Sequence, residues 1–147
     1  MRIGVTGTRS GMTGEQRINL QTFLKRKMKW HDEVITPEFH HGDCVGVDVE
    51  AALIASEEGY RIVCHPPNKE DLRGWFKSDE TRGTASYFKR NRQLVDDVDL
   101  LIVIPYQDEW SSEGGTWYTH DYAEKRRVET LTLWPSEEVH RLIGQGR

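Results

Sequence analysis

Short apolar runs alternate with amphipathic stretches along most of the chain, and this alternation predicts an α/β protein. The wholly apolar run Leu100–Ile104 is typical of a strand that is buried on both faces of a parallel sheet. The predicted strands are Arg2–Thr6, Glu33–Phe39, Arg61–Cys64, Leu100–Ile104 and Glu129–Leu133.

Helical periodicity fills most of the intervals between these strands. The first helix is predicted from Thr13 to about Lys29, because Thr13 is a good N-cap and Gln16 completes a capping box. The other predicted helices are one that begins at Val47 and has Gly59 at C′, a basic one from Tyr87, one from about Gly115 to Arg126, and a short one from Pro135 to about Gly144.

Residues 66–85 are polar and are predicted as a long connection without a strand. A connection of this length inside a compact domain usually has a function. Trp75 and Phe76 in its middle need burial, so the segment is either a lid over a site or a loop packed against a partner subunit. The sequence leaves both alternatives open.

This order of elements predicts a Rossmann-like open parallel sheet of about five strands with helices on both faces. The 147 residues fit a single domain. Ligands of such sheets bind outside the carboxyl ends of the strands, at the point where the strand order reverses. The turns at Gly7, Gly42 and Gly114 all fall at that edge, so we expect them to meet there.

The net charge and the cysteine content limit the binding partners and the cellular compartment to be expected. The formal net charge of −4 argues against nucleic-acid binding through a generally basic surface. No early apolar run resembles a signal peptide, and none is long enough to span a membrane. Two cysteines without a Cys-x-x-Cys pair fit a reducing compartment. We therefore expect a cytoplasmic protein without a membrane partner.

Two glycine-bearing turns are candidates for ligand binding. Gly114, Gly115 and Thr116 open a predicted helix, where free backbone amides and the helix dipole favour an anion. The turn after the first strand would hold the other end of the ligand. The predicted binding residues are Gly7, Thr8, Arg9, Ser10, Gly42, Arg90, Trp110, Gly114, Gly115 and Thr116. The alternative interpretation of each turn is an ordinary strand-to-helix connection that binds no ligand.

Arginine and aromatic side chains would complete this pocket. Arg90 flanks the apolar face of the basic helix and is predicted to contact phosphate, whereas Arg92 points further away. Trp110 lies in the loop before the glycines and is predicted to stack on a base. Tyr106, Trp117 and Tyr118 surround the same loop. Core or dimer packing is the alternative role for these aromatic rings.

Carboxylates raise the question of catalysis. Cleavage of an N-glycosidic bond needs a carboxylate to stabilise an oxocarbenium-like state or to position water. Glu113 and Asp43 are the acidic residues expected to face one another over the pocket, and the predicted catalytic set is Glu113, Arg90 and Asp43. Their alternative role is to cap helices.

Histidines and cysteines gather near the predicted ends of the second and third strands. They are His40, His41, Cys44, Cys64 and His65. Their spacing matches no recognised zinc-ligand pattern, so we predict neither a metal site nor a cofactor. His120, in the helix after the glycines, is more typical of a partly buried surface histidine than of a general acid.

Several short motifs, taken together and in order, resemble the SLOG superfamily, which includes the Lonely Guy (LOG) phosphoribohydrolases and the DNA-processing protein A family. The motifs are Val5-Thr6-Gly7-Thr8-Arg9-Ser10, His41-Gly42-Asp43-Cys44-Val45-Gly46-Val47-Asp48, Arg90-Asn91-Arg92, Asp99-Leu100-Leu101-Ile102-Val103 and Gly114-Gly115-Thr116. The resemblance covers roughly residues 2 to 133. It implies a Rossmann-like fold, a nucleotide or nucleotide-derived ligand, no obligatory metal and often a dimer.

The resemblance also assigns single residues. Arg90-Asn91-Arg92 is similar to the Arg-Asn-Arg of the DNA-processing family, and Arg90 takes the place of the LOG catalytic arginine. Gly114-Gly115-Thr116 is similar to the LOG phosphate motif Pro-Gly-Gly-x-Gly-Thr-x-x-Glu. The proline is missing here, and Thr119 stands where the catalytic glutamate would be.

The leading hypothesis is binding of a nucleotide or nucleotide-derived phosphate ligand at the carboxyl edge of the sheet. The first alternative is an N-glycoside hydrolase of nucleoside monophosphates, and the second is binding of single-stranded DNA. Nucleic acid is possible as a partner but is not favoured. A homodimer or higher homo-oligomer is expected.

Overall fold

The computed structural model of the chain describes residues 1–31, 34–111 and 114–136. The elements follow the predicted alternation of strands and helices. In chain order they are β1 (Arg2–Gly7), α1 (Gly14–Trp30), β2 (Glu38–His41), α2 (Val47–Glu57), β3 (Arg61–Cys64), the 3₁₀ turn η1 (Glu70–Leu72), β4 (Glu80–Thr81), α3 (Tyr87–Asp96), β5 (Leu100–Ile104), α4 (Gly115–Lys125) and β6 (Glu129–Thr132).

All six strands belong to one parallel sheet with the order β4-β3-β2-β1-β5-β6. The chain builds outward from β1 to β4 on one side, and α3 then returns it to the other side of β1. The strand order therefore reverses between β1 and β5. This is the position where α/β sheets of this kind bind their ligands.

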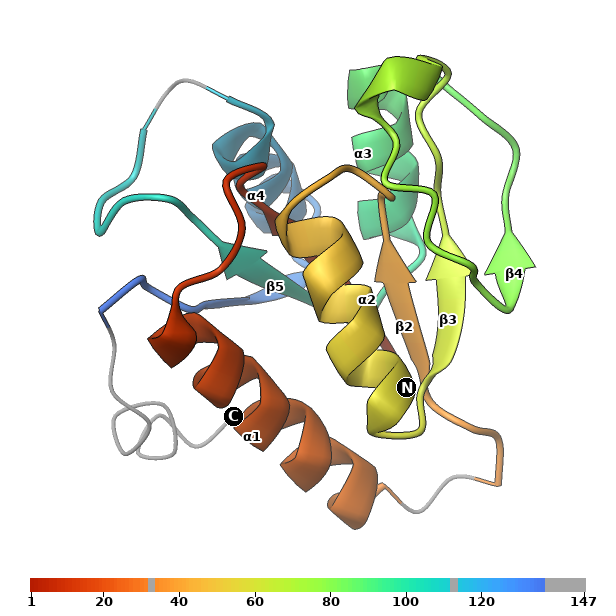
Figure 1. Cartoon of the computed structure of the whole chain (residues 1–147), viewed down its shortest axis with the longest axis vertical. Coiled ribbons are helices and arrows are strands. Elements are labelled where there is room, and N and C mark those ends of the chain that lie inside the picture. The colour runs from red at the N-terminus through yellow and green to blue at the C-terminus, as the bar shows by residue number, and fades with distance from the viewer. Residues whose placement is uncertain (32–33, 112–113, 137–147) are drawn as a thin grey trace.

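Helices cover both faces of the sheet, with α1 and α2 in front and α3 and α4 behind in the view of Figure 1. Alternate residues of β5 pack on opposite layers, because successive side chains of a strand point to opposite faces. Ile102 and Ile104 pack with residues of α1 and α2, whereas Leu101 and Val103 pack with residues of α3 and α4. This two-sided burial explains why the strand is apolar throughout.

The start of α1 is built as the sequence predicts. The Thr13 hydroxyl accepts a hydrogen bond from the Gln16 amide at 3.1 Å, and the Gln16 side chain accepts one from the Thr13 amide at 3.0 Å. The buried Gln16 side chain also donates to the carbonyls of Pro105 and Leu133, each at 2.9 Å. The cap thus fastens α1 to the segments that leave β5 and β6.

The second strand differs from the prediction Glu33–Phe39. It begins only at Glu38, after Pro37, and extends to His41. Proline has no N–H to donate to a neighbouring strand. Pro37 still accepts a hydrogen bond from the Arg61 amide at 3.0 Å, whereas Val34 and Ile35 before it are exposed.

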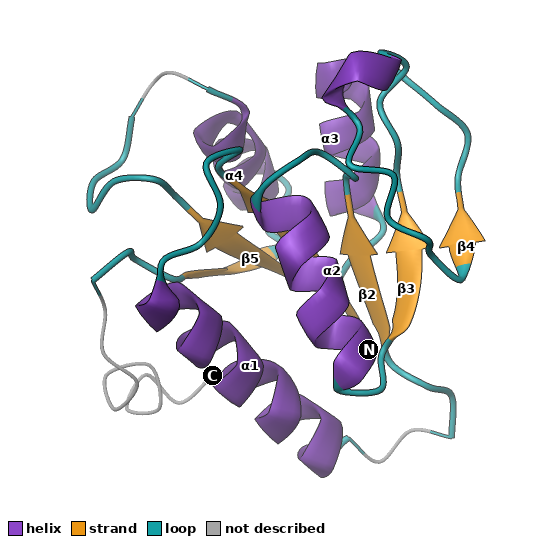
Figure 2. Ribbon diagram, in the orientation of Figure 1, coloured by secondary structure: helices purple, strands orange, loops and turns teal. Residues whose placement is uncertain are grey.

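The segment 66–85 contains a strand that the sequence analysis did not predict. Glu80 and Thr81 form β4 at the edge of the sheet, in parallel with β3 (Figure 2). Asp79 and Arg82 fix this short strand, because their amides donate to the carbonyls of Ile62 and Cys64 at 2.9 Å. Two polar residues have no apolar pattern, so nothing in the sequence indicates a strand here.

The burial expected for the two aromatic residues of this segment is only half realised. Phe76 packs against the core and meets the ring of His41 edge-to-face, with 5.7 Å between the ring centroids. Trp75 is 59% exposed and lies under the guanidinium of Arg73, whose carbon is 3.8 Å from the ring centroid. The lid and the partner contact stay open as predictions.

The other predicted elements agree closely with the structure. The strands at Arg61–Cys64 and Leu100–Ile104 are confirmed to the residue. The predicted helix from Pro135 falls, after Ser136, outside the described residues. Within the described ranges, no helix is long and apolar enough to cross a membrane.

We expect Thr13→Ala to lower the free energy of unfolding by about 1 kcal/mol, because it removes the hydroxyl of the capping box. Chemical denaturation measures this change. Thr22→Ala, in the interior of α1, is the matched control and should be neutral or slightly stabilising, since alanine is the better helix former. Equal losses in both variants would contradict the capping role.

Candidate functional site

A hollow of about 800 Å³ lies beside the carboxyl ends of β1 and β5. It is therefore at the point where the strand order reverses. Four segments contribute to it: the turn after β1, the start of α3, the loop after β5 and the start of α4. Its lining residues are Gly7, Thr8, Arg9, Tyr87, Phe88, Pro105, Tyr106, Gln107, Glu109, Ser111, Gly114, Gly115, Thr116, Trp117 and Tyr118.

The N-terminus of α4 opens into this hollow. Gly114 is the N-cap, with φ of 86°, and no side chain caps the first turn. The first amides of an α-helix have no partner within the helix, and the helix dipole makes this end attractive to an anion. Gly114, Gly115 and Thr116 thus present polar backbone to the hollow, as their sequence pattern predicts.

Gly115 also meets α3 at very close range. A Cβ at this position would lie 2.7 Å from Cε1 of the Tyr87 ring and closer still to its hydroxyl. Real side chains do not approach so closely, so only glycine fits here without displacing Tyr87. The tyrosine ring and the start of α4 are therefore positioned by one another.

Side chains of both charges line the hollow. Arg9, exposed in the turn after β1, has its guanidinium carbon 5.5 Å from the centroid of the Tyr87 ring. Glu109 lies on the loop after β5 and adds a carboxylate to the lining. The positive charge of the hollow therefore lies near β1, and the negative charge lies on the loop after β5.

Aromatic rings form much of the remaining wall. Phe88 stands between Tyr87 and Tyr118, and it meets each ring edge-to-face at centroid distances of 5.3 and 4.5 Å. Tyr106 is 65% exposed. The side of the hollow formed by α3 and α4 is thus rich in aromatic rings.

Trp110 lies in a second hollow of about 490 Å³ next to the first. Ser111 and Tyr118 line both hollows. The other residues of the second hollow are Arg92, Asp121, Tyr122 and Lys125. The Trp110 indole N–H donates to a carboxylate oxygen of Asp121 at 3.2 Å. The predicted stacking residue is therefore beside the glycine hollow rather than in it.

Arg90 is buried behind the main hollow and is only 2% exposed. Its guanidinium donates to the carbonyls of Gly42 and His65, to the Asn91 side chain at 2.7 Å and to the Cys44 sulfur at 3.5 Å. It borders a small cavity of about 20 Å³, which Gly42 also lines. The predicted phosphate contact of Arg90 stays a prediction, and the structure gives this side chain a role in joining loops.

The small cavity touches the main hollow through Gly7, Arg9 and Tyr87, which line both. Asp48 lies on its wall and accepts a hydrogen bond from the Cys44 amide at 3.2 Å. Burial raises the pKa of Asp48 to about 6, although the Arg90 charge and amide hydrogen bonds act in the opposite direction.

Asp43 is fully buried and does not line the main hollow. Its two carboxylate oxygens accept hydrogen bonds from Arg73 Nε and from the Phe76 amide, both at 2.8 Å. Its φ of 56° is unusual for a residue other than glycine. The geometry gives Asp43 a role in holding the segment around Gly74. Glu113, the other predicted catalytic carboxylate, lies outside the described residues.

The histidines of β2 point to opposite faces of the sheet. The His41 ring accepts a hydrogen bond from the Asp43 amide at 3.0 Å and lies 2.8 Å from the Ser78 hydroxyl, whereas the His40 ring lies against His65. Burial lowers the pKa of His41 to about 4 and that of His65 to about 3. These rings are therefore neutral at physiological pH.

The cysteines near these histidines are free, buried thiols. Burial raises the pKa of both Cys44 and Cys64, the latter to about 12. His120 is on α4, where its Nδ1 lies 2.8 Å from an Asp121 carboxylate oxygen. Cys64 does lie with a histidine, since the ligand atoms of His41, Asp43 and Cys64 are within 4.8 Å of one another, whereas His120 lies apart from them on α4.

The structure brings together most of the predicted ligand residues. Those that line the main hollow are Gly7, Thr8, Arg9, Gly114, Gly115 and Thr116. Ser10, Gly42, Arg90 and Trp110 lie outside its lining. Tyr87, Phe88, Pro105 and Gln107 line it but were not proposed as site residues. The position of Tyr87 in the sequence could have indicated this role, because Tyr87 is the first residue of the basic helix and lies on its apolar face.

Parallel strand order, glycine-opened α4 and a hollow at the reversal point define a Rossmann-like α/β protein. No family model and no curated protein sequence matches the chain. Solved structures do match it. The molybdenum cofactor binding protein of Rippkaea orientalis is similar, with a TM-score of 0.67 and 19% identity over 98% of this chain and 82% of that one.

Two further structures have the same fold. The molybdenum cofactor carrier protein of Chlamydomonas reinhardtii matches with a TM-score of 0.62 and 16% identity over 89% of this chain and 74% of that one. DNA processing protein A of Helicobacter pylori, described as binding single-stranded DNA, matches with a TM-score of 0.60 and 16% identity. The match covers 99% of this chain and 73% of that one. These likenesses confirm the predicted Rossmann-like fold.

The buried Asp48 predicts a pH dependence of stability. Its folded pKa of about 6 is above its ordinary value of 3.8, so the folded state binds the proton more tightly and loses that stabilisation as the pH rises from 3.8 through 6. Asp48→Asn removes this titration. Between about pH 5 and about pH 7.5, the native protein should lose about 1.4 kcal/mol relative to the variant. Denaturant unfolding at the two pH values measures the difference, and a constant difference would contradict the raised pKa.

Proposed function

We propose that the main hollow binds a nucleotide or a nucleotide-derived phosphate ligand. The observation that carries this proposal is the meeting of the glycine-opened N-terminus of α4 with Arg9 at one hollow. Amides at a helix N-terminus favour an anion, and a guanidinium can add a bidentate contact to phosphate. The fold supports the same location, because α/β sheets bind ligands where the strand order reverses.

In this proposal the phosphate is held by the amides of Gly115 and Thr116 and by the guanidinium of Arg9. The planar part of the ligand lies against Tyr87 and Phe88, whose rings form the wall next to the glycines. Aromatic faces attract flat rings with little dependence on their hydrogen-bonding pattern. The hollow would therefore select a phosphate attached to an aromatic ring system rather than a phosphate alone.

Arg90 supports the site from behind in this proposal. Its guanidinium carbon is 5.2 Å from the centroid of the Tyr87 ring, so it positions the tyrosine that Gly115 also touches. Hydrolysis is not part of the proposal, because Asp43, one of the two predicted catalytic carboxylates, is bound by Arg73 and Phe76 and does not line the hollow. Assaying the same nucleotides for released base tests hydrolysis directly.

We expect Arg9→Gln to weaken binding of nucleoside monophosphates by about tenfold or more, because it removes a charged hydrogen-bond donor. Calorimetry against a panel of nucleoside monophosphates and inorganic phosphate measures the loss. Arg17→Gln is the matched control, since Arg17 is on α1 and pairs with Glu50 at 3.0 Å. It should leave the affinity unchanged.

Gly115→Ala tests the other half of the site. The added methyl group would collide with Tyr87, so the ring or the helix start must move, and we expect nucleotide affinity to fall while the fold persists. Gly14→Ala is the control, because an added Cβ there meets nothing within 4 Å. Negligible binding by the native chain of every nucleotide tested, or equal affinity in native protein, Arg9→Gln and Gly115→Ala, would refute the proposal.

Single-stranded DNA is a second candidate ligand, and the second hollow favours it. Arg92 and Lys125 line that hollow together with Trp110, Tyr118 and Tyr122. Basic side chains interleaved with aromatic rings are typical of single-strand binding. The Arg92 guanidinium donates to the Tyr118 hydroxyl at 2.7 Å, and Tyr118 lines both hollows, so a strand running from one to the other would meet the two in succession.

The double variant Arg92→Gln, Lys125→Gln separates the two ligands. If DNA binds here, the affinity of the double variant for a fluorescent oligonucleotide should fall. The slope of the logarithm of its binding constant against the logarithm of the salt concentration should become shallower by about 0.7 per lost phosphate contact. Nucleoside monophosphate binding should be unaffected. A native protein that shows no salt-dependent binding to the oligonucleotide would exclude the DNA candidate and leave the nucleotide proposal standing.

A further inference from the structure

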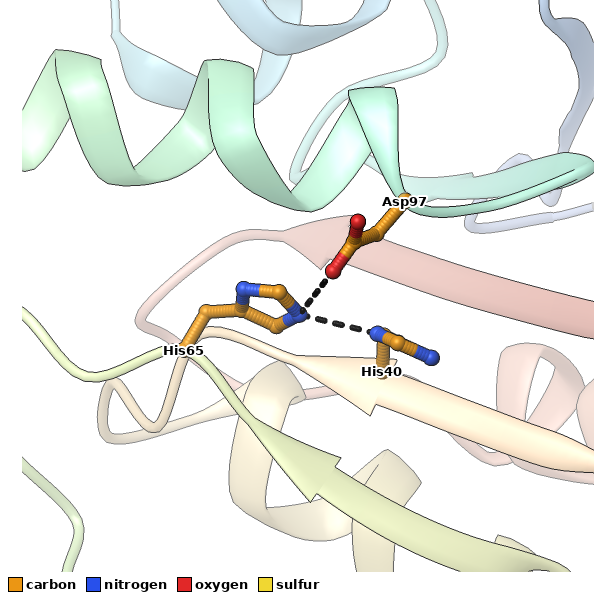
Figure 3. Close-up of side chains that lie close together, drawn as sticks. All are labelled: His40, His65 and Asp97. Carbon is orange, nitrogen blue, oxygen red and sulfur yellow. Dashed lines mark hydrogen bonds and ion pairs between the residues drawn. The ribbon is translucent and has the colours of Figure 1, made fainter. Parts of the chain in front are cut away.

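Three donor side chains from separate elements converge on the α3 side of the sheet. His40 comes from β2, His65 follows β3, and Asp97 is the C-cap of α3. In Figure 3 both histidine rings and the aspartate carboxylate are turned toward one another. His40 Nδ1 is 2.8 Å from His65 Nε2, which is 3.8 Å from Asp97 Oδ2. All three ligand atoms lie within 4.8 Å of one another.

A fourth residue fixes the orientation of His40. Its Nε2 lies 2.9 Å from Glu38 Oε1. A carboxylate accepts hydrogen bonds and does not donate them, so Nε2 carries the proton and Nδ1 presents its lone pair to the cluster. A carboxylate that holds the far nitrogen of a histidine is the usual second partner of a metal-bound imidazole. This arrangement therefore prepares His40 as a metal ligand through Nδ1.

The cluster is protected on one side and open on the other. His40 and His65 are 0% and 3% exposed, whereas the side chain of Asp97 is 30% exposed. An ion could therefore enter past the carboxylate and reach two imidazoles that water does not surround. None of these three residues lines either of the hollows described above, so the cluster is separate from the candidate ligand site.

We propose that His40, His65 and Asp97 bind a divalent transition-metal ion such as Zn²⁺, with water at the remaining position. Two imidazole nitrogens and one carboxylate oxygen are a donor set that zinc accepts. Metal–ligand bonds of about 2.0–2.1 Å place tetrahedral donors roughly 3.3 Å apart. The two rings would have to separate slightly from 2.8 Å, and Asp97 would have to approach from 3.8 Å.

Metal binding displaces the hydrogen that lies between the His40 and His65 rings. With Nε2 of His40 protonated, His65 donates its Nε2–H to His40 Nδ1. For both nitrogens to bind a metal, the His65 proton must move to Nδ1 of the same ring. Both rings stay neutral throughout, which suits their buried position, and the ion takes the place of the hydrogen between them.

Arg82 is the competitor for this site. Its Nη1 donates to Asp97 Oδ2 at 2.6 Å, and its Nε pairs with Glu80. A metal ion would have to draw Asp97 away from this guanidinium and would feel its positive charge. Because Glu80 remains available to Arg82, the arginine can give up one partner. Removing the arginine charge should therefore strengthen metal binding, an effect that a purely structural hydrogen-bond network does not predict.

The sequence pattern does not predict this donor set, because its third member is far from the two histidines along the chain. The predicted group joins His40 and His65 to His41, Cys44 and Cys64, whereas Asp97 is the C-cap of α3, far along the chain. The His41, Asp43 and Cys64 group is less suited to an ion. Asp43 already accepts hydrogen bonds from Arg73 and Phe76, and the neighbouring thiol stays protonated.

Cobalt(II) gives a direct test. The full chain, freed of metal with a chelator, is titrated with Co²⁺ near neutral pH and then with Zn²⁺ as competitor. We expect visible d–d absorption that saturates at one Co²⁺ per chain, is lost when Zn²⁺ is added, and accompanies a rise in the thermal unfolding midpoint, since an ion that binds the folded state stabilises it.

Variants of the partly exposed residues locate the site without disturbing the buried rings. Asp97→Asn should weaken Co²⁺ binding by about tenfold or more, and Glu38→Gln should weaken it by about tenfold. Arg82→Gln should instead strengthen it. His120→Gln, in the separate surface group of His120, Asp121 and Glu124, is the control and should leave the spectrum and the affinity unchanged.

Two results would overturn the proposal. One is the absence of a Co²⁺ spectrum at saturating metal in the native chain and in Arg82→Gln. The other is a spectrum that persists in Asp97→Asn but disappears in His120→Gln, which would assign the metal to α4. His65→Gln adds a check of the first ligand if it remains folded, and the Asp97 and Arg82 variants decide the outcome if it does not.

Discussion

The structure depends on the buried guanidinium of Arg90. A cation with 2% exposure is tolerated only when its donors are satisfied. The Gly42 and His65 carbonyls, which belong to the loops after β2 and β3, accept hydrogen bonds from it. One side chain of α3 therefore fastens the two loops to each other and to the helix. It lies against the ring of Tyr87 as well, so it also fixes one wall of the main hollow.

Through these contacts Arg90 links the two proposed sites, the main hollow and the metal site of His40, His65 and Asp97, although the sites share no residues. Arg90 reaches the main hollow through Tyr87, and it reaches the histidine cluster through the backbone of His65. The Asp48 carboxylate faces the same small cavity, where the Arg90 charge lowers the cost of burying it. A change at Arg90 would thus disturb both sites at once, so its effect on ligand binding would not by itself identify a phosphate contact. The more exposed Arg9 is the better probe of such a contact.

The chemistry of the main hollow follows from where α4 begins. Gly114 takes a positive φ that is easy for glycine, and Gly115 leaves room for Tyr87. Larger residues would either strain the turn or push the aromatic wall away. The free amides, the cation of Arg9 and the aromatic rings are consequently held within one hollow, and the proposed nucleotide binding depends on this combination.

The pattern of apolar and polar residues along the chain was sufficient to predict the sheet and the helices on its two faces. A strand buried on both faces must be apolar throughout, as β5 is, and a capping box declares a helix start in a few residues, as Thr13 and Gln16 do. Both signals can be read from a few consecutive residues, although the helices that bury β5 come from distant parts of the chain. The edge strand β4 lacked such a signal, since two polar residues are held there by hydrogen bonds to β3 rather than by burial.

The sequence by itself determined the parallel α/β sheet, the turn after β1 and the glycine opening of α4. Only the tertiary structure decided the direction in which long side chains point. It directed Arg90 inward to two carbonyls, Asp43 to Arg73 and Phe76, Trp110 to a neighbouring hollow, and Asp97 toward His40 and His65. The physical reason is that hydrogen-bond partners far apart in sequence become neighbours only when the strands pair, and no local pattern records that pairing.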